Sequence, residues 1–316
     1  NIFQVAESAS SRVFANHLSG GNVTVNGLFS MFYGLHPTYR QYIEIDPAKN
    51  QTLLTKQLAT MGYDIDVYTS SNLGPFSLKP LMFGDIADVH YVNPMSDTVI
   101  NNDQAVIDAV VSDLNQAPSQ DGTVPRKPWF KFVFVTSSHH SYEYPEKFGK
   151  FLPIEPNPER FVFNPGMDPT PLFNRYKNSV HYVDDLFGQV WQALGASETK
   201  QHTLTMITSD HGEEFDDNGI GFWGHGNNFS APQVTVPMVI HVGDKVNKRL
   251  SEQLLSLPKQ TQKLTGHIDI VPTVLHDVLA CKNPMSDYST GISLFDQKNS
   301  HLGMIVSSYI DTAFII

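Results

Sequence analysis

The chain has 316 residues, of which 41% are hydrophobic and 17% charged, a composition typical of one large globular domain and not of a disordered protein. Its 21 Lys and Arg residues against 32 Asp and Glu give a formal charge of −11. This balance argues against a nucleic-acid partner, because binding to a phosphate backbone needs clustered cations. Cys281 is the only cysteine, so the sequence excludes an intrachain disulfide and a Cys-rich zinc site.

Hydrophobic periodicity predicts helices that alternate with short buried strands. The chain opens in a predicted helix, Ile2–Leu18, and closes on the apolar residues 314–316, which are typical of an unfinished strand. Between them the pattern predicts helical segments over 25–35, 56–61, 106–114, 174–194 and 268–279, and strands over 63–68, 129–135, 202–208, 236–242 and 304–308. Strands separated by helices imply an α/β fold with a mostly parallel central sheet flanked by helices on both faces.

Both ends of the chain lie inside predicted elements, so we expect an excised domain whose N-terminal part held a membrane anchor. The chain itself has no apolar run that approaches the roughly 18–20 residues of a membrane helix. We expect a single domain over residues 1–316; in one alternative the part from about residue 265 packs as a smaller subdomain.

Two polar clusters directly follow predicted strands. Residues 137–140 (SSHH) follow the strand 129–135, and residues 209–212 (SDHG) follow the strand 202–208. Ligands of parallel sheets gather where loops leave the carboxyl ends of the strands, so the two clusters mark the expected site. The Pro-rich segment 145–171 is an expected surface loop and a candidate lid over that site.

The sequence SDHGEEF at 209–215, with GHG at 224–226, carries the strongest chemical signal. The Asp210 carboxylate and the His211 imidazole can both reach one dication from a strand-exit loop. This donor pair suits zinc or manganese better than calcium or magnesium. The alternative is structural, with Ser209 or Asp210 capping a helix whose first turn is rich in Glu.

These motifs together resemble the metal-binding motif of the alkaline-phosphatase/sulfatase superfamily. The resemblance implies a three-layer fold of that type, Asp210 and His211 as ligands of a divalent metal, and His225 in contact with the metal or the transferred phosphate. It also implies a first strand with a further acidic ligand, which we expect to be missing from this chain. The combination of GGNVTVNGLFSMFYGL with FWGHGNN is most similar to the periplasmic domains of inner-membrane proteins that regulate lipopolysaccharide.

The turn before the apolar segment 28–35 resembles the nucleophile-bearing turn of the superfamily, in which a glycine follows the nucleophile by ten residues. Counting back from Gly34 gives Thr24, which a dication would activate by lowering the pKa of its hydroxyl and which also serves as a metal ligand. At the start of a helix, Thr24 would also offer backbone N–H groups to a phosphate. The alternatives are a helix N-cap at Thr24 and a glycosylation sequon at Asn22. The Cys-x-Pro-Ser-Arg motif of formylglycine sulfatases is absent, which favours a phosphate ester over a sulfate ester.

Two further segments resemble the same superfamily. Related transferases and lipoteichoic acid synthase place a substrate-binding His after the strand that corresponds to 129–135, which implies a catalytic role for His140, with His139 as the alternative. The segment GHIDIVPTVL at 266–275 resembles an architectural helix start, in which His267 or Asp269 caps a packed helix.

The sequence thus predicts a metal-dependent hydrolase or phosphotransferase in which Thr24, His140 and His225 are catalytic. The expected metal is zinc or manganese, with calcium or magnesium as alternatives, and the expected substrate is a phosphoester of the cell envelope such as a phospholipid or lipid A. The expected location is the periplasmic side of an inner-membrane protein. The alternative function is a non-catalytic regulator that senses lipopolysaccharide or binds a protein partner.

Overall fold

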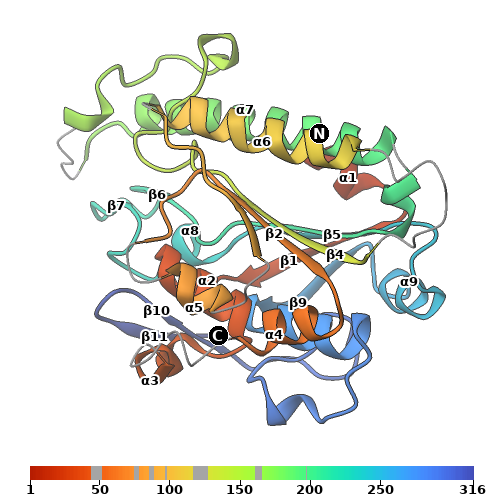
Figure 1. The fold of residues 1–316 in the computed structure, drawn as a ribbon. Coiled ribbons are helices and arrows are strands. Elements are labelled where there is room, and N and C mark those ends of the chain that lie inside the picture. Colours follow the sequence, from red (N-terminus) through yellow and green to blue (C-terminus); the bar gives the residue numbers. More distant parts are fainter. Residues whose placement is uncertain are drawn as a thin grey trace.

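The computed structural model describes residues 1–43, 52–74, 78–84, 89–96, 98–116, 127–160, 166–196 and 198–316. Helices and strands alternate along the chain, and two sheets lie between layers of helices (Figure 1). The predicted α/β class is therefore correct. Within the described ranges, none of the helices combines the length and the apolar character that crossing a bilayer requires.

The first sheet has the strand order β5-β8-β1-β9. It consists of β5 (Leu204–Thr208), β8 (Met238–Val242), β1 (Ser11–Leu18) and β9 (Gln260–Gly266). β1 pairs in parallel with β9, whereas β8 runs antiparallel to both β1 and β5. The sheet is therefore mixed, where the sequence predicts mostly parallel pairing.

β1 lies in the segment that the sequence predicts as a helix, and that prediction is wrong. The helix α1 spans only Ile2–Glu7, and the strand β1 begins at Ser11. β1 is central in its sheet, so side chains on both of its faces are buried. Such strands lose the alternation of polar and apolar residues and cannot be distinguished from helices by periodicity.

The second sheet has the order β3-β2-β4, and its pairs are all parallel, as predicted. Its strands are β3 (Val89–Val92), β2 (Asp64–Thr69) and β4 (Trp129–Phe134). Two small antiparallel pairs complete the strands: β6 (Glu214–Phe215) with β7 (Trp223–Gly224), and β10 (Met304–Ser307) with β11 (Thr312–Ile315).

Long helices cover one side of the sheets, and shorter ones the other (Figure 1). α6 (Val99–Asn115) and α7 (Thr170–Ala196) form the first layer. The second contains α2 (Thr24–Tyr33), α4 (Leu53–Thr60), α5 (Leu78–Phe83) and a continuous helical segment made of η6 (His267–Asp269), α10 (Ile270–Pro272) and η7 (Thr273–Val278). The remaining helical pieces are α3 (Arg40–Ile43), α8 (Ala231–Val234), α9 (Lys248–Leu255), η1 (Pro37–Tyr39), η3 (Glu146–Phe148), η4 (Pro158–Arg160), η5 (Glu198–His202) and η8 (Met285–Asp287).

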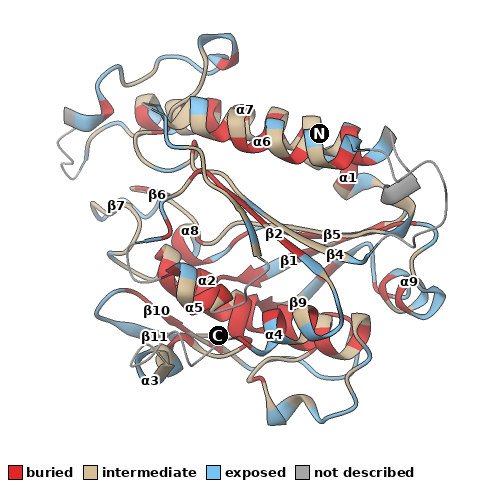
Figure 2. Ribbon diagram, in the orientation of Figure 1, coloured by how far each residue is buried: buried red, intermediate tan, exposed pale blue. Residues whose placement is uncertain are grey.

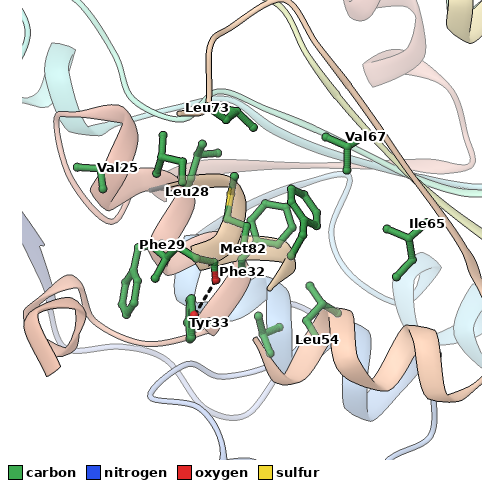
Figure 3. Close-up of a cluster of buried hydrophobic side chains, with 14 of the residues drawn as sticks. Val25, Leu28, Phe29, Phe32, Tyr33, Leu54, Ile65, Val67, Leu73 and Met82 are labelled. Atoms are coloured by element: carbon green, nitrogen blue, oxygen red, sulfur yellow. Dashed lines mark hydrogen bonds between the residues drawn. The ribbon is translucent and has the colours of Figure 1, made fainter. Parts of the chain in front are cut away.

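The core around α2 fixes this helix in place. Figure 2 shows α2 among the most buried elements, and Figure 3 shows its apolar side chains meeting those of β2 and α4. Phe32 packs edge-on against Phe83 and Phe132, and the buried Tyr33 hydroxyl donates to the Leu81 carbonyl at 2.7 Å. Burial of this many apolar side chains is what holds the start of α2 against the sheet.

The described part of the predicted lid segment, 145–171, is bound to α7 and does not cover the cavity of the site. Asn178 on α7 accepts from the Phe151 amide and donates to its carbonyl, and Asn174 donates to the Pro153 carbonyl. These bonds fasten the loop along α7, and none of its described residues lines the cavity that holds Thr24. Residues 161–165 of this segment lie outside the described residues.

Candidate active site

A cavity of about 310 Å³ opens where β4 and β5 end and α2 begins. Four of the predicted residues line it, although they come from distant parts of the chain: Thr24, His140, Asp210 and His211. The predicted His225 lies directly against this group, because its ring centroid is 4.2 Å from that of His211. The structure therefore brings the whole predicted set together.

Thr24 is the first residue of α2, and its side chain is free of the structural roles that could have explained it. The helix N-cap is Val23, so the N-cap alternative for Thr24 is wrong. Instead, the Thr24 Oγ1 lies 3.4 Å from the His211 Nε2. Asn22 is fully buried and donates to the Asn228 carbonyl and to Gln233, a position that no glycan could reach.

The loop that carries Asp210 is packed directly on α2. A Cβ atom at Gly27 would lie 2.1 Å from the Asp210 carbonyl oxygen, and the Ser19 hydroxyl donates to the same oxygen. The residues after Asp210 form no helix in the described structure until α8, so the proposed helix cap at Ser209 or Asp210 is wrong. The loop serves to place side chains at the cavity.

The hydrogen bonding of His211 leaves one ring nitrogen available. Its Nδ1 is 2.9 Å from the Gly212 carbonyl, an acceptor only, so this nitrogen carries the proton in the neutral ring. The Nε2 lone pair then points toward Thr24 Oγ1, and the Asp210 Oδ2 lies 3.5 Å away. An imidazole fixed through Nδ1 by a carbonyl is the usual arrangement of a metal-binding histidine.

Glu213 belongs to the site, although sequence reasoning did not select it. Its carboxylate accepts from the Tyr142 hydroxyl at 2.8 Å and lies 3.0 Å from the His225 Nδ1. Burial raises the pKa of Glu213, but the hydrogen bonds from His225 and Tyr142 and the nearby His211 outweigh it, so the pKa is lowered. Donor atoms of His211, Glu213 and His225 lie within 4.8 Å of one another.

The neighbouring Glu214 has a purely structural position. It is fully buried and accepts hydrogen bonds from four side chains of the segment that follows it, those of Asn218, Asn228, Ser230 and Gln233. Burial raises its pKa and these four donors lower it below the ordinary value. Glu214 thereby folds the loop that presents His225.

Both histidines of the SSHH cluster line the cavity. The His139 ring lies 5.1 Å from that of His225, and the His140 ring lies 5.5 Å from that of Tyr142. His267, by contrast, is fully buried and sits 3.1 Å from the Gly27 carbonyl through its Nδ1. Asp269 accepts from the amides of Gly266 and Ile292, so this segment acts as architecture beneath the site.

The residues present fit a divalent cation. Imidazole and carboxylate donors are the set that zinc and manganese prefer, and His211 Nε2, Asp210 and Thr24 meet at the cavity wall. The described lining contains no Lys or Arg, so neutralisation of a bound anion there depends on histidines and on such a cation.

Comparison with known proteins finds a matching family and several relatives. The model of the Sulfatase family matches residues 5–277. The inner membrane protein YejM of Salmonella typhi is 22% identical over 291 residues, which make up 91% of this chain and 40% of YejM. The phosphoethanolamine transferase EptA of Salmonella typhimurium is 32% identical over 124 residues, or 38% of this chain and 22% of EptA. The chain thus spans well under half the length of these curated relatives.

A solved structure with a similar fold is the C-terminal periplasmic domain of EcEptC from Escherichia coli in complex with Zn. It has a TM-score of 0.70 and 17% sequence identity, and the superposition covers 98% of this chain and 82% of that domain. The fold of residues 1–316 is therefore of the alkaline-phosphatase/sulfatase type.

Proposed function

Because the chain belongs to the sulfatase family, within the alkaline phosphatase superfamily, we propose that it transfers a phosphate group from an envelope phosphoester by means of Thr24. The observation that carries the proposal is the Thr24 hydroxyl, which lies 3.4 Å from the His211 Nε2 at the cavity wall and has no capping role. A phosphate ester is favoured over a sulfate ester, and a phospholipid or lipid A is the expected donor. The similarity to EptA supports this class of substrate.

His211, Asp210 and Thr24 would hold a divalent metal, with zinc or manganese preferred over calcium or magnesium. Glu213 and His225 are close enough to His211 to share in its binding. When bound, the cation lowers the pKa of the Thr24 hydroxyl and neutralises charge on the phosphoryl oxygens.

In the proposed step, a bond forms between Thr24 Oγ1 and phosphorus while the bond from phosphorus to the leaving oxygen breaks. The hydroxyl proton is released to solvent. The His225 ring acts in this step as the imidazolium: its Nδ1 proton is donated to Glu213 and its Nε2 proton passes to the leaving oxygen. The proton released by Thr24 replaces it. His140, or His139 in its place, orients the phosphate. Water or an acceptor hydroxyl then attacks the phosphothreonine and restores Thr24.

The proposed setting is the periplasmic side of the inner membrane. YejM is an inner membrane protein, and EcEptC has a periplasmic domain of this fold. We further propose that residues 1–316 form one domain.

The test is metal content together with turnover of a phosphodiester and a phosphomonoester, bis(4-nitrophenyl) and 4-nitrophenyl phosphate. We expect Thr24→Ala to lower turnover by about 10³-fold or more, with a smaller loss of metal because Asp210 and His211 remain as ligands. Asp210→Asn should lower both, and Glu213→Gln should lower turnover by about 10–100-fold. Thr60→Ala, a threonine on the exposed side of α4, is the matched control and should change neither.

A folded protein that takes up no metal and turns over no phosphate or sulfate ester would contradict the proposal. In that case a non-catalytic role in sensing lipopolysaccharide would replace it. Full turnover by Thr24→Ala would contradict the assignment of the nucleophile alone.

A further inference from the structure

A surface of apolar side chains and lysines, all exposed except the half-buried Lys177, lies where the loop after β4 packs on the first turns of α7. We call it the lysine–aromatic patch; it consists of Lys147, Lys150, Phe151, Leu152, Phe173 and Lys177. Its apolar members are unusually accessible for their size, because Phe151 is 39%, Leu152 71% and Phe173 41% exposed. Large apolar side chains that gather on a surface mark an interaction site more often than single ones do.

The loop and the helix that carry the patch are held together. Lys177 Nζ lies 4.6 Å from the ring centre of Phe151 and 4.9 Å from that of Phe173, so it bridges the loop and the helix. Lys150 Nζ lies 3.1 Å from the His181 Nε2 on the same helix. The buried Asn178 binds both the amide and the carbonyl of Phe151, which fixes the loop that carries Phe151 and Leu152.

The charge of the patch differs from that of the molecule. The chain carries −11 overall, yet no described carboxylate forms an ion pair with Lys147, Lys150 or Lys177. The exposed Glu146 is the acidic neighbour of Lys147 in η3. Lysines beside exposed aromatic and aliphatic side chains are the arrangement that suits the interface of an anionic membrane.

The patch also adjoins the cavity. Phe173 stacks on Tyr176 at 6.3 Å and meets Phe215 at 5.3 Å between ring centres. Tyr176 lines the cavity that holds Thr24. One aromatic side chain therefore separates the exposed patch from the proposed site.

We propose that the lysine–aromatic patch docks the domain onto an anionic phospholipid surface. The lysines contact the phosphate groups, and Phe151, Leu152 and Phe173 enter the interface between headgroups and acyl chains. This contact turns the nearby cavity toward the membrane. Delivery of a lipid phosphoester to Thr24 from that surface rests on the proposed function, whereas the surface contact itself does not.

The experiment is cosedimentation of the 316-residue chain with vesicles of phosphatidylcholine, alone or with 30% phosphatidylglycerol, at about 0.05 and 0.5 M salt. We expect binding to the anionic vesicles only, and weaker binding at high salt because counterions screen the lysines. Replacement of Lys147, Lys150 and Lys177 by Glu should reduce the affinity at least about 100-fold, since each lysine near such a surface contributes about fivefold.

The matched control replaces Lys56, Lys248 and Lys298, which are exposed on other parts of the molecule, by Glu. This control variant has the same net charge as the patch variant, and it should still bind the anionic vesicles. Leu152→Ser should also weaken binding, while Leu302→Ser, which alters a residue 90% exposed elsewhere, should not. Thr24→Ala should bind vesicles as the unaltered chain does, which separates this proposal from the proposed activity. Absence of binding to anionic vesicles at low salt, or equal losses in the two triple variants, would overturn it.

Discussion

His267 is a buried titratable side chain directly beneath the site. It has no exposed surface, and its Nδ1 lies 3.1 Å from the carbonyl of Gly27 in α2. Burial lowers its pKa to about 4, against an ordinary value near 6.5. Burial also lowers the pKa of His17, whose ring lies 5.5 Å from that of His267. Both rings are therefore neutral in the folded protein at pH 7.

This pair predicts a loss of stability in mild acid. The folded pKa of His267 is below the unfolded one, so between about pH 6.5 and 4 the unfolded chain binds a proton that the folded chain does not. Stability is then complete above that range and falls as the pH is lowered through it. The contribution of His267 alone should lower the free energy of unfolding by about 2 kcal/mol as the pH falls from 7.5 to 5. Urea unfolding of His267→Asn should show a smaller pH dependence, while His202→Asn, at an exposed histidine, should leave it unchanged.

Single residues also show how much of the site could be predicted from the sequence. Asp210, His211, Thr24 and His225 could be found because they stand in short motifs whose chemistry is readable. The difference between Glu213 and Glu214 could not, although the two are adjacent. It depends on Tyr142, which meets Glu213 across 71 positions of sequence, and on the four donors that surround Glu214. Only the folded chain brings those groups together.

Among the elements, α2 determines whether Thr24 and His211 meet. Gly27 lies one turn after Thr24 on the face of α2 that touches the Asp210 loop, and a Cβ there would lie 2.1 Å from a backbone oxygen. The helix cannot move away, because its other faces pack in the core around Phe32. The absence of a side chain at Gly27 is therefore what allows the close approach.

Gly27→Ala should consequently push the Asp210 loop away from α2. We expect a loss of stability of several kcal/mol, as overpacking in a tight core produces, together with reduced metal binding. Gly195→Ala is the matched control, since this glycine also lies in a helix but a Cβ would make only ordinary contacts. That variant should be stabilised by about 0.5–1 kcal/mol. Thermal unfolding measures both changes, and equal stabilities of the two variants would contradict the role of Gly27.

An element could be predicted from the sequence when only one of its faces is buried. α7 and α6 have one buried face and one exposed face, so their helical periodicity is plain in the sequence, and both predictions are confirmed. β1 is buried on both faces, and its apolar residues merge with those of α1 into an apparent helix. The antiparallel direction of β8 could not be predicted either, because chain direction within a sheet depends on connections and not on local pattern.

Considered as a whole, the described molecule has two sheets with strands that lack a second neighbour. β4 pairs only with β2, and β5 only with β8, among the described residues. All residues of β5 are half-buried, and so are most of β4, whereas β8 is buried throughout. The carboxyl ends of β4 and β5 border the same cavity.

These edges make a prediction about the 316-residue chain in solution. Unpaired N–H and C=O groups beside apolar side chains template pairing with other chains, so we expect association that increases with protein concentration, measured by sedimentation velocity. Val133 lies within β4 and is 37% exposed, so Val133→Lys should reduce this association without lowering the unfolding temperature. Val239→Lys, at a position 4% exposed in β8, should instead unfold the domain, because it buries an unpaired charge.

Hydrogen exchange offers an independent measure: amides of β4 and β5 should exchange faster than those of β8. Equal protection of all three strands, with no association at high concentration, would mean that neither edge is open.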